Sequence, residues 1–300
     1  MLIHVGFPKT GSTWLQEDMF SNPSTGFWSP WTFEVKEQYL LSNPYRFSAE
    51  RARRLFQPGC DDAARRGLVP VITDEWLIGN QMSGDYRGKQ IAEQLHATFP
   101  AAVVLIVIRE QEAMLMSSYR EYVQVGGGQT LEEFIGVASA LPGFVPQCRL
   151  DHFEFDLAIS HYRELFGDTR VIVEPFERMV ADPIAFHARV AECAGARGSY
   201  QQPQQARNVG LRGATLTTRR ALNNLVHPFG LNFTRGARRR RWIGRSAAVI
   251  GRMLPASAHA RQESDLRRRL HSHIEGYYAA SNQRTSKLLG IDLAEFGYAG

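Results

Sequence analysis

The sequence predicts an α/β fold, a parallel β-sheet flanked by helices in a three-layer sandwich, and two observations predict it. Four short apolar runs rich in β-branched residues recur along the chain, with helical patterns between them. A loop with two glycines follows the first run directly and opens the first helical pattern. Strands that alternate with helices form parallel sheets, because each helix returns the chain to the edge where the next strand begins.

The individual elements follow from periodicity and from turn residues. Strands are expected at residues 2–7, 69–73, 103–108 and 170–173. Helices are expected at residues 12–20, 87–98, 110–122, 131–138 and 159–166, and helical periodicity returns over 266–289. Thr130 and Glu133 have the spacing of a capping box, which predicts a helix start at that point.

The chain is expected to form one domain, residues 1–300, with residues 197–300 as a C-terminal elaboration of it. Its 300 residues are 44% hydrophobic, enough to bury a core without disulfides or metals. Cys60, Cys148 and Cys193 are far apart and include no CxxC pair, which argues against a disulfide scaffold or a zinc ribbon. The first apolar run is too short for a signal peptide, and no run approaches the roughly 18 residues of a membrane span. A soluble, cytoplasmic protein is therefore expected.

Basic residues gather in one segment of this basic chain. The formal net charge is +5 and the pI is about 9.2, which favours anionic ligands in general. Residues 235–245 hold six arginines around Trp242: Arg235, Arg238, Arg239, Arg240, Arg241 and Arg245. Three interpretations stay open: a solvated face, a peripheral contact with an anionic surface, or a site for an acidic glycan or lipid acceptor. No specific nucleic-acid partner is expected, and the oligomeric state is left open.

The most informative stretch is GFPKTGST, residues 6–13, between the first strand and the first helix. Backbone N–H groups around Gly11 and the start of the helix predict a loop that cradles an oxyanion. In a Walker A loop the lysine directly follows the second glycine, but here Ser12 holds that position and the lysine is Lys9. A lysine at the crown of the loop can neutralise charge on the oxygen between a 5′-phosphate and a transferring group, without a metal.

A second phosphate site is predicted at the end of the strand 103–108. Arg109 follows this strand, and Ser117 lies two helical turns further on, so one face can present both to a single anion. Arg109 offers a bidentate guanidinium fork and Ser117 a hydroxyl. Two separate phosphate sites on one sheet suit a nucleotide that is phosphorylated at both ends.

These two motifs resemble those of the sulfotransferases that use 3′-phosphoadenosine 5′-phosphosulfate (PAPS). The stretch PKTGSTWL, residues 8–15, is similar to the family's 5′-phosphosulfate loop, and Arg109, Ser117 and Tyr119 are similar to its 3′-phosphate motif. The resemblance is clear over residues 1–194 and returns at 277–300. It implies that Lys9 contacts the bridging oxygen and that Trp14 stacks on adenine. It further implies nucleotide contacts from loop residues and from a later arginine loop: Thr10, Gly11, Ser12, Thr13, Arg207 and Arg212.

The general base is expected to be a carboxylate. The cytosolic branch of the family uses a histidine after the second strand, but this chain has Thr73, Asp74 and Glu75 there. The carbohydrate branch uses a glutamate after the first helix, and TFEVKEQY, residues 32–39, resembles that segment. Glu34 is therefore the first candidate, Glu75 the second and Glu37 the third. No cluster has metal-ligand spacing, so the expected chemistry uses no metal.

The predicted activity is transfer of a sulfuryl group from PAPS to an acceptor hydroxyl or amine by in-line displacement. A carbohydrate, a lipid and a small molecule all remain open as acceptors. The alternative is a P-loop small-molecule kinase that uses ATP and Mg²⁺, with Asp74 as the metal ligand and Glu75 beside the nucleophile. Ser12 in place of the Walker lysine argues against the kinase.

Overall fold

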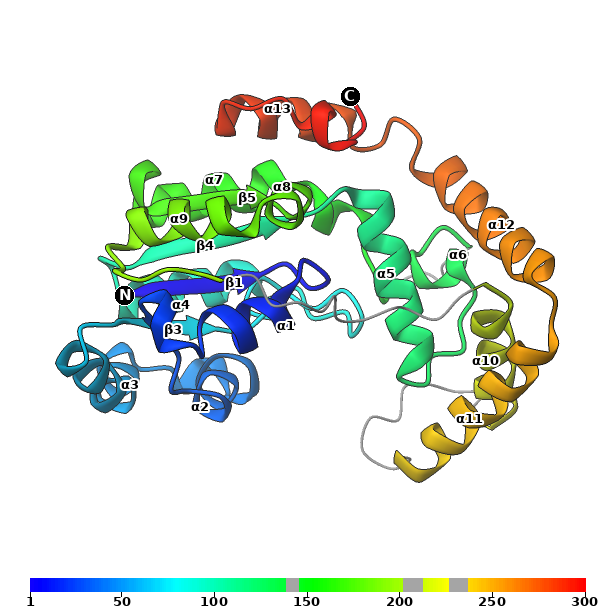
Figure 1. Ribbon diagram of the computed structural model, residues 1–300, viewed down its shortest axis with the longest axis horizontal. Coiled ribbons are helices and arrows are strands. Elements are labelled where there is room, and N and C mark those ends of the chain that lie inside the picture. Colours follow the sequence, from blue (N-terminus) through cyan, green and yellow to red (C-terminus); the bar gives the residue numbers. More distant parts are fainter. Residues whose placement is uncertain (139–145, 202–212, 227–236) are drawn as a thin grey trace.

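The computed structural model describes residues 1–138, 146–201, 213–226 and 237–300. Within these ranges a five-stranded sheet has the order β2-β3-β1-β4-β5, and every strand pair is parallel (Figure 1). The strands are β1 (Leu2–Gly6), β2 (Phe27–Trp28), β3 (Val69–Thr73), β4 (Val103–Ile108) and β5 (Val171–Pro175). The parallel sheet confirms the predicted fold class, and β2 is the strand that the sequence did not predict.

The central strand β1 lies at the switch point of the sheet. Leu2 pairs with Val71 of β3 on one side and with Val103 of β4 on the other. The connection from β1 leads to β2 at one edge of the sheet, whereas the connection from the neighbouring β4 leads to β5 at the other edge. Ligands of open parallel sheets bind outside the carboxyl ends of the strands at such a point.

Alternate residues of β1 enter two different cores, which makes the sandwich three-layered. Ile3 and Val5 pack on one side with α3 (Ala49–Arg65), α4 (Gly88–Thr98) and α7 (Phe155–Phe166). Leu2 packs on the other side with η1 (Leu15–Met19), which continues α1 (Ser12–Trp14), and with α9 (Pro183–Ala194). The period of two follows from the pleat of a strand.

Short elements connect these layers. They are η2 (Pro23–Thr25), α2 (Phe33–Val35), η3 (Lys36–Leu41), η4 (Pro44–Arg46), α6 (Leu131–Phe134), η5 (Leu150–Phe153), η6 (Asp168–Arg170), α8 (Phe176–Ala181) and η7 (Leu293–Phe296). Thr130 and Glu133 form the predicted capping box at the start of α6. That helix ends at Phe134 rather than at residue 138, and Gly136 follows with a φ of +77°.

An arm of three helices, α10 (Gly213–Val226), α11 (Ala237–Met253) and α12 (Ala256–Ile274), lies on the far side of α5 (Gln111–Gln124) from the sheet (Figure 1). The Asn223 amide donates to the carbonyl of Val123 at 2.9 Å, and Arg120 pairs with Glu263. The predicted helical stretch 266–289 is two helices, because Gly276 turns the chain between α12 and α13 (Ala279–Leu289). The division of the chain at residue 197 stays a prediction. No helix of the described ranges has the length and apolarity needed to span a bilayer.

Candidate functional site

Polar side chains converge at the carboxyl ends of four neighbouring strands. The loop after β1 supplies Lys9, the segment after β3 supplies Asp74 and Glu75, and the end of β4 supplies Arg109. Glu177, on α8 directly after β5, accepts a hydrogen bond from the backbone N–H of Glu110 at 3.1 Å. The parallel topology thus brings residues more than one hundred positions apart to one edge.

The loop after β1 is held in a conformation that needs its glycine. Lys9 has a φ of +70° and Gly11 a φ of +83°. This φ favours glycine at position 11, and a Cβ there would also lie 2.7 Å from Cε of Met179 on α8, which would have to move. The Thr10 hydroxyl is buried and donates to the carbonyl of Phe7, which closes the loop on itself.

Lys9 lies where the two predicted phosphate motifs meet. Its Nζ is 2.7 Å from Oε2 of Glu121 on α5, and both side chains are half-buried. Its carbonyl oxygen accepts a hydrogen bond from Nη1 of Arg109 at 2.9 Å. Ser117 precedes Glu121 by one helical turn and therefore shares the face of α5 that is turned toward Lys9. The two motifs thus contribute to one site.

Arg109 keeps unused donors at this site. Its guanidinium lies over the ring of Phe176, 4.6 Å from the centroid. Its Nε is buried and has no hydrogen-bond partner in the described part of the chain. Burial lowers the pKa of Arg109, while the nearby Glu177 and Glu110 act in the opposite direction. A guanidinium with a spare buried N–H is suited to an anion that fills the remaining positions.

Glu75 is largely buried beside the phosphate loop. Burial raises the pKa of its carboxyl, Glu121 and Asp74 add to the rise, and the Ser12 hydroxyl and Lys9 oppose it. The Ser12 Oγ is buried without a well-formed hydrogen bond to any residue that the structure describes. A Cβ on Gly6 would lie 2.4 Å from the Glu75 carbonyl oxygen, so the end of β1 touches the backbone of Glu75 directly. The backbone of Glu75 is therefore held against the end of β1, and its carboxyl is close enough to Lys9 for the ammonium to lower its pKa.

The neighbouring Asp74 has a cationic partner that the sequence did not single out. Lys36 Nζ lies 3.6 Å from Asp74 Oδ2, and the ammonium is 5.0 Å from the centroid of the Trp76 ring. Asp74 Oδ1 accepts from the backbone N–H of Trp76 at 2.9 Å. Burial nevertheless raises the pKa of Asp74, with Lys36 opposing.

The other predicted bases have different surroundings. Glu34 Oε2 accepts from the backbone N–H of Thr32 at 3.2 Å, and Glu37 is exposed. Within the described residues no contact joins Glu34 to Lys9, although Lys36 on the same helical segment reaches Asp74. Of the three candidates, Glu75 is the one that the fold brings to the loop.

The predicted adenine contacts are only partly described. Trp14 Nε1 donates to the hydroxyl of Tyr200 at 2.8 Å, with the two rings edge to face. Thr13 is exposed at the start of α1. Arg207 and Arg212 lie outside the described residues.

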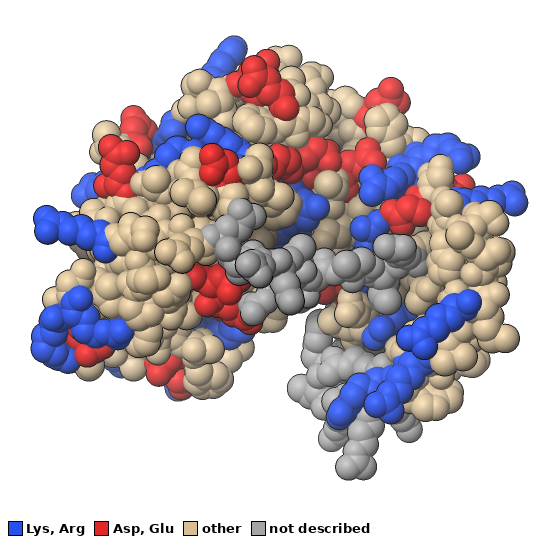
Figure 2. All heavy atoms as spheres, in the orientation of Figure 1, with Lys and Arg blue, Asp and Glu red and all other residues tan. Residues whose placement is uncertain are grey.

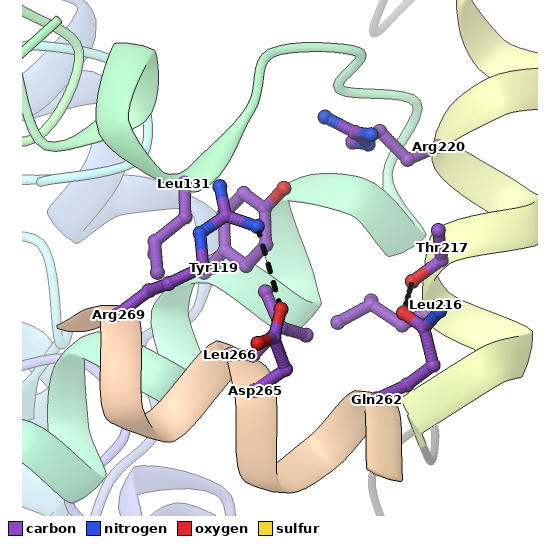
Figure 3. A pocket seen from close by; sticks show the side chains of 9 residues that line it. All are labelled: Tyr119, Leu131, Leu216, Thr217, Arg220, Gln262, Asp265, Leu266 and Arg269. Carbon is purple, nitrogen blue, oxygen red and sulfur yellow. Dashed lines mark hydrogen bonds and ion pairs between the residues drawn. The ribbon is translucent and has the colours of Figure 1, made fainter. Parts of the chain in front are cut away.

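Tyr119 faces away from the loop, toward the arm (Figure 3). Its hydroxyl donates to the carbonyl of Gln129 at 3.0 Å. It lines a cavity of about 50 Å³ between α5, α10 and α12, together with Leu131, Leu216, Thr217, Arg220, Gln262, Asp265, Leu266 and Arg269. Tyr119 of the predicted 3′-phosphate motif therefore packs where the arm contacts α5.

A larger cavity of about 240 Å³ lies behind the loop, at the N-terminal ends of α4 and α7. Phe7 forms one wall, and Tyr86, Lys89 and His152 supply polar groups. Burial lowers the pKa of His152 to about 4. None of the residues that line this cavity belongs to the cluster around Lys9 and Glu75.

In the described ranges no three His, Cys, Asp or Glu side chains are grouped as a metal site would need.

Comparisons with known proteins identify the fold. No family model matches the chain, and no curated protein matches it. A sulfotransferase from Alicyclobacillus acidocaldarius has a similar structure, with a TM-score of 0.55 at 14% identity over 99% of this chain and 98% of that one. A sulfotransferase domain from the curacin biosynthetic pathway aligns with a TM-score of 0.42 at 14% identity, over 91% of this chain and 96% of that one. The first of these similarities confirms that the chain has a sulfotransferase-family fold.

Proposed function

We propose that this chain, which has a sulfotransferase fold, transfers a sulfuryl group from PAPS to an acceptor hydroxyl or amine. One observation carries the proposal: the hydrogen bond of 2.9 Å from Arg109 Nη1 to the carbonyl of Lys9. It joins the cation of the β1 loop to the cation at the end of β4. A nucleotide with a phosphate at each end is a ligand that can engage both.

The polar groups that meet at this edge fit such a ligand. Lys9, the loop amides and the Ser12 hydroxyl would hold the 5′-phosphosulfate, and Arg109 with Ser117 would hold the 3′-phosphate. The buried Arg109 Nε has no hydrogen-bond partner in the described ranges, as expected of a group whose partner is a ligand. To bind the phosphosulfate, the Lys9 ammonium exchanges its ion pair with Glu121 for the anion.

The reaction needs a base and a cation at opposite ends of the transferring group. A bond forms from the acceptor atom to sulfur while the bond from sulfur to the bridging phosphate oxygen breaks. Glu75 accepts the acceptor's proton, and the raised pKa of its carboxyl makes it a stronger base than an ordinary glutamate. Lys9 neutralises the charge that develops on the leaving phosphate oxygen. Glu34 is the alternative base that the family resemblance implies.

A binding measurement followed by an activity assay tests the proposal. The desulfated product, 3′-phosphoadenosine 5′-phosphate (PAP), should raise the melting temperature without added metal, since a ligand that binds the native state stabilises it. Labelled PAPS should then transfer its sulfuryl group to a member of a panel of carbohydrate, lipid and small-molecule acceptors. Stabilisation by ATP and Mg²⁺ with no response to PAP would overturn the proposal in favour of a kinase.

A further inference from the structure

Helix α11 exposes an apolar stripe beside arginines. Trp242, Val249 and Met253 are 62%, 55% and 80% exposed, and their spacing of seven and four residues places them on one side of the helix. Arg245 and Arg252 are also exposed and lie next to this stripe on the helix surface. Exposed apolar side chains in one row mark a surface that is used for binding.

The orientation of α11 is fixed by its opposite side. Ile243 and Ala247 of α11 are buried within the arm. A Cβ on Gly251 would lie 2.2 Å from Oγ1 of Thr215 on α10, so the two backbones approach closely there. The stripe of Trp242, Val249 and Met253 therefore points outward as a consequence of packing.

The charge of this region differs from that of the rest of the chain. Residues 193–262 contain 13 arginines and no aspartate or glutamate, whereas the remaining residues contain 22 basic and 30 acidic side chains. Figure 2 shows Lys and Arg side chains, without Asp or Glu, over the lower right of the molecule, where Figure 1 draws α11. The stretch 193–262, which includes α10 and α11, is thus positive while the remainder of the chain is negative.

We propose that α11 docks the protein on an anionic lipid surface. Such a surface uses both features, because the apolar stripe enters the interface between headgroups and acyl chains while the arginines meet the negative headgroups. A nucleic acid or an acidic glycan would engage the arginines but leave Trp242, Val249 and Met253 in water. A second copy of the chain, paired through the same face, would place arginines against arginines. The proposal rests on other residues than the proposed sulfuryl transfer, so either can fail alone.

Vesicle binding by the full chain tests the docking surface. The protein should co-float with vesicles of phosphatidylcholine and phosphatidylglycerol, much less with phosphatidylcholine alone, and less as ionic strength rises. Arg245→Ser with Arg252→Ser should weaken binding about 25-fold, since each arginine near an anionic surface contributes roughly five-fold. Trp242→Ser with Val249→Ser and Met253→Ser should weaken it by about ten-fold or more, because burial of these side chains is lost.

Matched variants distinguish binding through α11 from nonspecific attraction of vesicles to any exposed apolar or basic side chain. Val180→Ser with Ile184→Ser removes apolar side chains that are 59% and 54% exposed elsewhere, and Arg54→Ser with Arg65→Ser removes two arginines of α3. Both should bind vesicles like the wild type. Equal losses in these controls would overturn the proposal.

The fluorescence of Trp242 gives a readout at the site itself. Brominated lipids should quench part of the tryptophan emission of the wild type, and Trp242→Phe should abolish that part while vesicle binding persists. Unchanged quenching in this variant would contradict the docking geometry.

Two other outcomes would replace the lipid surface by a different partner. If vesicles do not bind, and binding to heparin or DNA survives the Trp242, Val249 and Met253 substitutions, the partner is a polyanion. A dimer that dissociates on those substitutions, with no vesicle binding, would replace it by a second copy of the chain.

Discussion

The cations at the carboxyl edge of the sheet and the arginines of α11 have different surroundings. At the edge, Lys9 pairs with Glu121, and Arg109 binds a loop carbonyl and lies over Phe176. On α11, Arg245 and Arg252 are exposed and make no ion pair with any residue that the structure describes. Cations held by partners from several strands suit one compact ligand, whereas cations in a row on one helix suit an extended surface.

Helix α5 connects the two regions. One side carries Glu121 to Lys9, and another carries Tyr119 and Val123 to the arm. The proposed 3′-phosphate site and the contact surface of the arm therefore share a single helix. Substitutions at the edge should change nucleotide chemistry without changing vesicle binding, which is the sharpest way to separate the two regions.

The largest effect is expected from Lys9→Ala. Loss of the charge that neutralises the leaving oxygen should lower kcat by about 10²–10³-fold, while vesicle binding stays unchanged. Lys36→Ala is the matched control, because Lys36 is also a cation at this edge but pairs with Asp74. Steady-state kinetics with labelled PAPS check both variants, and an equal loss in the two would show that Lys9 acts only through the net charge of the edge.

Glu75→Gln should have the next largest effect. Removal of the base should lower kcat by about 10²–10⁴-fold, with the affinity for PAP nearly unchanged. Glu34→Gln is the control, because it makes the same change at the other candidate base. A loss of kcat confined to Glu34→Gln would assign the base to Glu34 instead.

The raised pKa of Glu75 also predicts opposite pH trends for activity and stability. The base must be ionised, so kcat should rise as pH rises through the raised pKa. A folded carboxyl whose pKa lies above the unfolded value of 4.5 favours the protonated form, so its contribution to stability falls as pH rises from 4.5 to the folded pKa. Glu75→Gln should therefore melt at a higher temperature than the wild type at pH 8. A lower melting temperature in calorimetry would show that the carboxylate is stabilising.

Arg109→Ala should have a smaller and more selective effect. Loss of hydrogen bonds to a charged group should weaken PAP binding by about ten- to hundred-fold. Adenosine 5′-phosphate lacks the 3′-phosphate, so its affinity should change much less. Calorimetric titration of both nucleotides measures the difference, and equal losses would place Arg109 outside a 3′-phosphate site.

Patterns of neighbouring residues predicted four strands, the loop after β1 and Arg109. Helix α3 and the pairing of Lys9 depend on contacts between residues that are far apart in the sequence. The β-branched runs, the phosphate loop and Arg109 were evident because each follows from neighbouring residues. Helix α3 was missed because Pro58 and Gly59 interrupt its pattern, and it forms because its buried side chains, including Phe56, pack on the core. Glu121 lies more than one hundred residues from Lys9, so only the folded chain pairs them. Glu34 was ranked before Glu75 on the resemblance of its segment, and the burial of Glu75 beside the loop is not visible in a spacing.

Glu121→Gln should have the smallest effect. It tests whether the ion pair between Glu121 and Lys9 competes with the nucleotide for the Lys9 ammonium. In the free protein Glu121 holds the Lys9 ammonium, and an anion at the loop has to displace it. A half-buried ion pair is worth about 0.2–1 kcal/mol, so the variant should bind PAP about 1.4- to five-fold more tightly. The gain should shrink at high salt, which screens the competing carboxylate. Glu112→Gln on the same helix is the control, because Glu112 faces His271 of the arm. Weaker binding of PAP by Glu121→Gln would show that Glu121 positions Lys9 for the ligand and does not compete with it.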